Sequence, residues 1–89
     1  MIKGKTESGF EFELHDDVMD DMELVDLMVD INTTGNPAAL SNAMKAMLGA
    51  EQKKALYDHL RNEDGRVPVS EVSRAFVDVV KAAKEKGKN

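Results

Sequence analysis

The chain has 89 residues, the size of one small domain, and it contains no cysteine. The lack of cysteine excludes disulfide bonds, thiolate zinc sites and cysteine nucleophiles. The start of the chain lacks a signal-peptide pattern, and no apolar run approaches the roughly 18 residues of a membrane-spanning helix. We therefore expect a single domain over residues 1–89 that is cytoplasmic and makes no contact with a membrane.

The formal net charge of −5 is unevenly distributed. Residues 1–32 contain ten acidic and two basic side chains, a charge of −8, which leaves +3 for residues 33–89. An acidic half of this kind repels a phosphate backbone, so the charge pattern argues against nucleic acid as a partner.

Residues 1–14 alternate as a β-hairpin does. Glu7, Ser8 and Gly9 form the expected loop, with Gly9 in a left-handed conformation. The resulting register places Ile2, Gly4 and Thr6 opposite Leu14, Phe12 and Phe10 on one face, and Lys3 and Lys5 opposite Glu13 and Glu11 on the other. Because a lone hairpin is marginally stable in water, we expect it to pack on helices or to form a homo-oligomer through its edge.

The helical part is predicted to span residues 17–84, and its first helix follows an acidic segment. Asp17 or Asp20 is the expected N-cap, and the helix is expected to end near Asn32. Its apolar positions are Met22, Val25, Met28 and Val29, widened by Leu24, Leu27 and Ile31. This stripe is either core or an adaptable methionine-containing surface for a partner, and Met22, Val25, Met28 and Val29 are the candidate partner-binding residues.

Three further helices are expected after a loop at residues 33–36. The second starts with Asn36 as N-cap and Pro37 at its first position, and ends at Gly49. Its buried stripe is Leu40, Ala43, Met44, Met47 and Leu48. The third helix starts at Ala50 and directs Leu56, Tyr57 and Leu60 inward.

The fourth helix is expected to have Ser70 as its N-cap and to be followed by a frayed basic tail at residues 85–89. Its inward positions recur at helical spacing: Val72, Phe76, Val79, Val80 and Ala83. The predicted fold class is therefore α+β, an N-terminal β-hairpin followed by about four α-helices.

The joint between the third and fourth helices partly matches a calcium-binding EF-hand loop. If Leu60 is position 1, then positions 3, 5, 6 and 12 are Asn62, Asp64, Gly65 and Glu71. However, Leu60 has no oxygen ligand, where an EF-hand has an aspartate, and Pro68 restricts the loop. We interpret the joint as a turn, and we keep a degenerate EF-hand-like or other small cytosolic protein-interaction or regulatory module as the alternative function.

The residue pattern does not indicate catalysis. His15 and His59 are far apart in sequence, and neither has a partner residue that would form a triad or a metal-ligand set. The aspartates at positions 16, 17, 20 and 21 lack a glycine bend that would bring them around one cation, so we interpret them as helix-capping residues. We expect no enzymatic activity, no metal and no cofactor.

Several segments together resemble the small tail assembly chaperones of long-tailed, siphovirus-type phages and prophages of Gram-positive bacteria. These segments are residues 2–13, 20–25, 48–56 and 60–68. The resemblance implies a non-enzymatic protein that binds the tape measure protein and the tail tube protein during tail assembly. It also implies that the protein works in the bacterial host cytoplasm and is absent from the mature virion.

Overall fold

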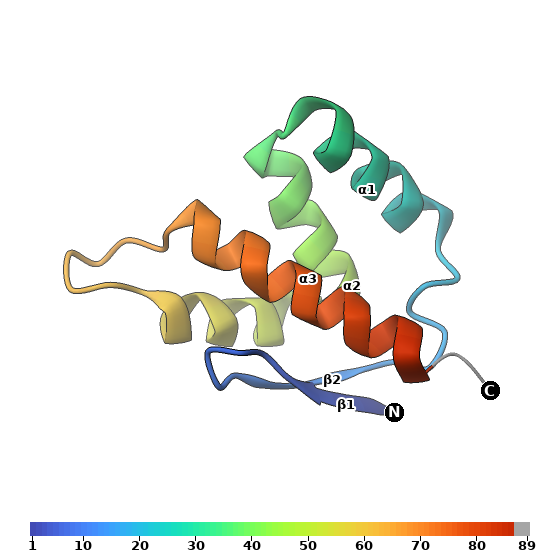
Figure 1. Cartoon of the computed structure of the whole chain (residues 1–89), viewed down its shortest axis with the longest axis horizontal. Coiled ribbons are helices and arrows are strands. Elements are labelled where there is room, and N and C mark those ends of the chain that lie inside the picture. Colours follow the sequence, from blue (N-terminus) through green and yellow to red (C-terminus); the bar gives the residue numbers. More distant parts are fainter. Residues whose placement is uncertain (87–89) are drawn as a thin grey trace.

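The computed structural model describes residues 1–86, and it is a small α+β domain. A two-stranded antiparallel sheet of β1 (Ile2–Lys5) and β2 (Glu11–Leu14) precedes three helices, α1 (Met22–Thr34), α2 (Pro37–Leu60) and α3 (Val69–Lys86) (Figure 1). The predicted α+β class is confirmed, whereas the prediction of about four helices is wrong. Of the expected frayed tail, residues 85 and 86 belong to α3, and residues 87–89 lie outside the described residues.

The helix count differs because the predicted second and third helices form one element, α2. Gly49 interrupts the helical geometry inside α2 with φ 81° and ψ 165°, and the chain turns sharply there (Figure 1). The two predicted helices are both present on either side of this break, and because no loop separates them they are counted together as α2. Its start is as predicted, since Asn36 Oδ1 accepts a hydrogen bond of 3.0 Å from the Ala38 amide and Pro37 follows as the first helical residue.

The hairpin has the predicted register. Ile2 lies opposite Leu14 and Gly4 opposite Phe12, while Lys3 and Lys5 face Glu13 and Glu11 across the two strands. The loop is closed by the Thr6 amide, which donates to the Phe10 carbonyl oxygen at 2.9 Å, and Gly9 has the expected positive φ of 98°.

The apolar face of the hairpin is covered by helices, as expected for a sheet of two strands. β1 packs against α3, and β2 packs against α2. A close approach explains the glycine in β1: a Cβ built on Gly4 would lie 2.5 Å from Cζ of Phe12 and 3.1 Å from Cβ of Ala82 in α3. The Phe12 ring therefore occupies space that any side chain at position 4 would need.

One hydrophobic core joins the hairpin to all three helices. Its fully buried large side chains are Leu14, Leu24, Met44, Leu56 and Val79. The apolar positions predicted to be inward in the first half of α2 are all buried, and Val72, Phe76, Val79 and Ala83 of α3 are also buried. The helical spacing of the sequence thus located the core faces of α2 and α3 correctly.

The N-termini of α1 and α3 differ from the predictions. Asp21, rather than Asp17 or Asp20, caps α1, and its Oδ1 accepts from the Glu23 amide at 3.0 Å. Asp17 and Asp20 are instead joined by a backbone turn, in which the Asp20 amide donates to the Asp17 carbonyl. This turn buries Val18 in the core and so delays the start of the helix. At α3, Ser70 already lies inside the helix.

The outer edge of β2 is covered by the side chain of Gln52 from α2. The Glu13 amide donates to Gln52 Oε1 at 2.8 Å, and Gln52 Nε2 donates to the Glu13 carbonyl at 2.7 Å and to the Leu48 carbonyl at 2.8 Å. The primary amide therefore satisfies the same two backbone groups of Glu13 that a third strand would use.

We expect Gln52→Leu to lower the free energy of unfolding by about 0.5–1.5 kcal/mol, because it removes the hydrogen bonds to the exposed backbone groups of Glu13, which water then replaces. Amide hydrogen exchange at Glu13 should be faster in this variant than in the wild type. Lys54→Leu, at an exposed neighbouring position of α2, is the control and should leave exchange at Glu13 unchanged. Unaltered protection of Glu13 in Gln52→Leu would show that Gln52 does not close this edge.

Candidate functional site

The apolar residues of α1 form two surfaces instead of one. Leu24 is fully buried, and Leu27, Met28 and Ile31 are half-buried against the rest of the protein. Met22, Val25 and Val29 are instead exposed, with 69%, 39% and 55% of their surface accessible. The buried stripe of α1 is therefore centred on Leu24 and Ile31, and the interpretation of Met22, Val25 and Val29 as core residues is wrong.

Helical geometry explains this division. At about 100° per residue, Leu24 and Ile31 share one side of the helix, whereas Met22 and Val29 lie on the opposite side. Val25 and Met28 lie between these sides, so the apolar surface continues from the core around to solvent. We call Met22, Val25, Met28 and Val29 the outer stripe of α1. Three of these four predicted partner-binding residues are exposed, and Met28 connects them to the core.

An apolar groove lies between α1 and α3, beside Met28. Its volume is about 360 Å³, and Leu40 of α2 also lines it. The apolar wall on the α3 side is made by Phe76, Val77 and Val80. Val77 is 54% exposed although it belongs to a packed helix. The two helices that flank the groove both pack on α2.

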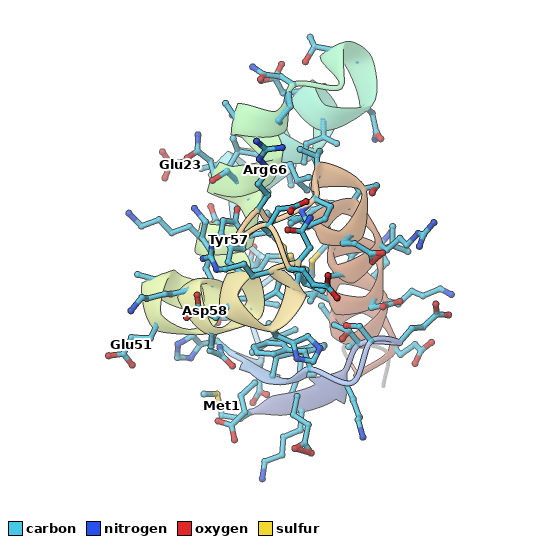
Figure 2. The ribbon with its side chains drawn as sticks, turned by 90° about the vertical axis from the view of Figure 1, so that its left-hand side faces the viewer. Met1, Glu23, Glu51, Tyr57, Asp58 and Arg66 are labelled. Atoms are coloured by element: carbon cyan, nitrogen blue, oxygen red, sulfur yellow. The ribbon has the colours of Figure 1, made fainter. Side chains whose placement is uncertain are left out.

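The charges around this groove are one-sided. Among the described residues, the charged side chains that line it are Lys81 and Lys84, both on α3. The wall on the α1 side contributes the neutral Asn32. The acidic residues of α1 line a different hollow on the other side of that helix: Glu23, Asp26 and Asp30. Glu23 projects outward on the side of the molecule away from α3 (Figure 2).

Sequence reasoning did not single out Val77, and it interpreted the lysines of residues 81–89, Lys81 and Lys84 among them, as solvated. Their spacing was a usable signal, because residues three and four positions apart on a helix share a face: Val77 and Lys84 are three and four positions from Val80, and Lys81 is four positions from Val77. Val77 lies outside the buried stripe of α3. The helical spacing therefore gives this apolar residue no place in the core.

The loop that resembles an EF-hand is held by its own hydrogen bonds. Asn62 Oδ1 accepts from the amides of Asp64 and Arg66, each at 3.0 Å, and the Arg61 guanidinium donates to the Gly65 carbonyl at 2.9 Å. Glu71 lies in α3 and pairs with Arg74 at 3.4 Å. The side chain of Asn62 is thus committed to the turn that joins α2 to α3.

The two histidines are not brought together. His59 lies near the end of α2, where its Nε2 is 3.1 Å from the Ser8 carbonyl oxygen and its ring centroid is 5.7 Å from that of Phe10. These contacts fasten the hairpin loop to α2, which is a structural role. Within residues 1–86, no group of three or more His, Cys, Asp or Glu side chains is arranged to hold a metal ion.

Comparisons with known proteins give no match: no family model, no curated protein sequence and no solved structure is similar to this chain. None of the helices within residues 1–86 is both long enough and apolar enough to cross a membrane. The outer stripe of α1 and the groove beside it are therefore the features on which a functional proposal rests.

Proposed function

We propose that this protein is a tail assembly chaperone of a long-tailed phage or prophage. In this role it binds the tape measure protein, and with it the tail tube protein, in the host cytoplasm during tail assembly, without entering the mature virion. The proposal joins the resemblance of four sequence segments to one structural observation, the exposed outer stripe of α1. The protein acts by binding, and no enzymatic step is part of the proposal.

The outer stripe suits a chaperone for a long helical protein. Met22, Val25 and Val29 present apolar side chains to solvent on a helix whose neighbouring side carries Glu23, Asp26 and Asp30. Exposed apolar residues that cluster together mark binding surfaces in soluble domains, and acidic neighbours limit non-specific association. The flexible side chains of Met22 and Met28 adapt to different apolar partners along a long chain.

The test is co-expression with the tape measure protein encoded in the same tail gene cluster, with the soluble fraction of that protein as the readout. We expect the wild-type chain to raise this fraction at least several-fold. The double variant Val25→Asp and Val29→Asp should abolish the increase, because a charged side chain in an apolar contact loses its hydration without gaining a partner.

Val69→Asp is the matched control, because Val69 is 54% exposed, close to the 55% of Val29, but lies at the start of α3. It should retain the wild-type effect. Circular dichroism of each variant verifies that the fold is intact. If the tape measure protein is equally soluble with and without the wild-type chain, the chaperone proposal is wrong.

A further inference from the structure

We propose that this protein forms a symmetric dimer in which the outer stripe of α1 from each copy occupies the groove between α1 and α3 of the other copy. The inference goes beyond the proposed chaperone function and does not depend on it, since both halves of the contact lie on this chain. Both contacts use the outer stripe of α1, so the dimer is the form of the protein without a partner, and a partner that binds the outer stripe displaces the second copy. It rests on complementarity of shape, of apolar surface and of charge.

The groove supplies one half of the contact. Its lining residues on α3 extend from Ser73 to Lys84, a length of about 16 Å at the rise of an α-helix, which is about three turns. Its walls and floor are mainly apolar, and an amphipathic helix is the element that fits between two helices in this way. On the α1 side the lining residues extend only from Met28 to Asn32, so a helix placed in the groove lies mainly along α3.

The outer stripe supplies the other half. Met22, Val25 and Val29 recur at the three- and four-residue spacing by which a helix binds in an apolar groove. α1 has 13 residues and lies at the periphery of the molecule (Figure 1). Met22, Val25 and Val29 of the outer stripe are exposed to solvent. A helix of this length matches the three turns that the groove offers.

The positions of the charged residues favour one orientation of α1 in the groove of the other copy. Along the outer stripe, acidic residues lie on one side only, where Asp26 and Asp30 follow each other by one turn. Along the groove, basic residues also lie on one wall only, where Lys81 and Lys84 follow each other by nearly one turn. An α1 helix placed in the groove of another copy can therefore direct both aspartates toward both lysines. In a two-fold symmetric dimer this set of contacts occurs twice.

The edge of the hairpin is the alternative surface for self-association. Its backbone groups are less available for pairing with a second chain. The backbone groups of Glu13 on the edge of β2 are already bonded to Gln52. The Glu7 amide, just beyond β1, donates to Asp78 of α3 at 3.0 Å. β1 itself carries the exposed Lys3 and Lys5, and charged side chains on an edge strand oppose pairing between chains.

The test uses the full chain and sedimentation equilibrium at about 50 mM salt, where contacts between exposed charges are weakly screened. The wild type should dimerise reversibly. Lys81→Glu with Lys84→Glu should weaken the dimer at least tenfold, and Asp26→Lys with Asp30→Lys should do the same. Mixing these two charge-reversed proteins should restore a heterodimer, because each then offers the charges that the other requires. Lys45→Glu, an exposed residue on α2, is the control and should leave the dimer unchanged.

A measurement on the unmodified protein makes the test independent of how the variants fold. On dilution, the methyl signals of Val25, Val29, Val77 and Val80 should shift together, while those of Leu14 should not. The proposal is overturned if the wild type is a monomer at millimolar concentration or if charge reversal leaves the dimer unchanged. It is also overturned if the mixed variants fail to associate, or if Lys5→Pro at the hairpin edge, rather than charge reversal, abolishes the dimer.

Discussion

Replacing Leu24 by alanine is expected to lower the free energy of unfolding by about 2–5 kcal/mol, the range for removing a large side chain from a packed core. Leu24 has no accessible surface and is the one residue of α1 that is fully buried. Its removal leaves a cavity at the contact between α1 and α2, the helix against which α1 mainly packs. Urea unfolding followed by circular dichroism measures the change.

Val29→Ala is the matched comparison, because it also shortens an aliphatic side chain of α1 but at a position that is 55% exposed. We expect its effect to remain within about 0.5 kcal/mol, as for most surface substitutions. The pair of variants thus distinguishes the two sides of the helix. Equal losses at Leu24 and Val29 would contradict the assignment of Val29 to the outer stripe.

Gly49→Asn is expected to destabilise the protein by about 1–3 kcal/mol, the usual cost of a sparsely populated backbone conformation. At φ 81° and ψ 165°, Gly49 occupies a region that is almost restricted to glycine. Apart from the chain neighbours of Gly49 and the adjoining helix backbone, no atom lies within 4 Å of a Cβ built at this position, so we expect the loss to come from the backbone conformation. Thermal unfolding of the variant and the wild type measures it.

Gly35→Asn separates this effect from a general intolerance of glycine replacement. Gly35 ends α1 with φ 65° and ψ 19°, the left-handed helical conformation that asparagine also adopts. A Cβ at Gly35 likewise has no atom within 4 Å. We expect a change of about 0.5 kcal/mol or less. If Gly49→Asn is equally mild, the sharp break in α2 does not require the glycine-only conformation, and our explanation of Gly49 is wrong.

Short-range rules accounted for much of the fold. The hairpin register followed from the position of Gly9 and the alternation around it, and the start of α2 followed from Asn36 and Pro37. The core faces of α2 and α3 followed from helical spacing. In each of these cases the local preference and the tertiary packing favour the same arrangement, so the sequence pattern alone was sufficient.

The differences arose where local patterns permit two outcomes. Apolar residues surround more than half of α1, and only the position of α2 decides that Leu24 rather than Val25 is buried. In the sequence, Gly49 is equally compatible with the end of a helix and with a kink inside a helix. The candidate groove depends on the distance between α1 and α3, two elements far apart in sequence. The spacing of Val77, Lys81 and Lys84 places them on one face of α3, but it does not show that α1 lies opposite that face.

The order in which the elements pack has a consequence for biosynthesis. The strand β1 lies near the beginning of the sequence, yet Ala82 of α3 lies against Gly4, and Asp78 accepts the Glu7 amide. A hairpin of two short strands is marginal by itself, and although α2 covers β2, the apolar side of β1 is not covered until α3 has left the ribosome. Formation of these sequence-distant contacts is accordingly a late folding step, and the incomplete nascent chain exposes Ile2 and Phe12 until then.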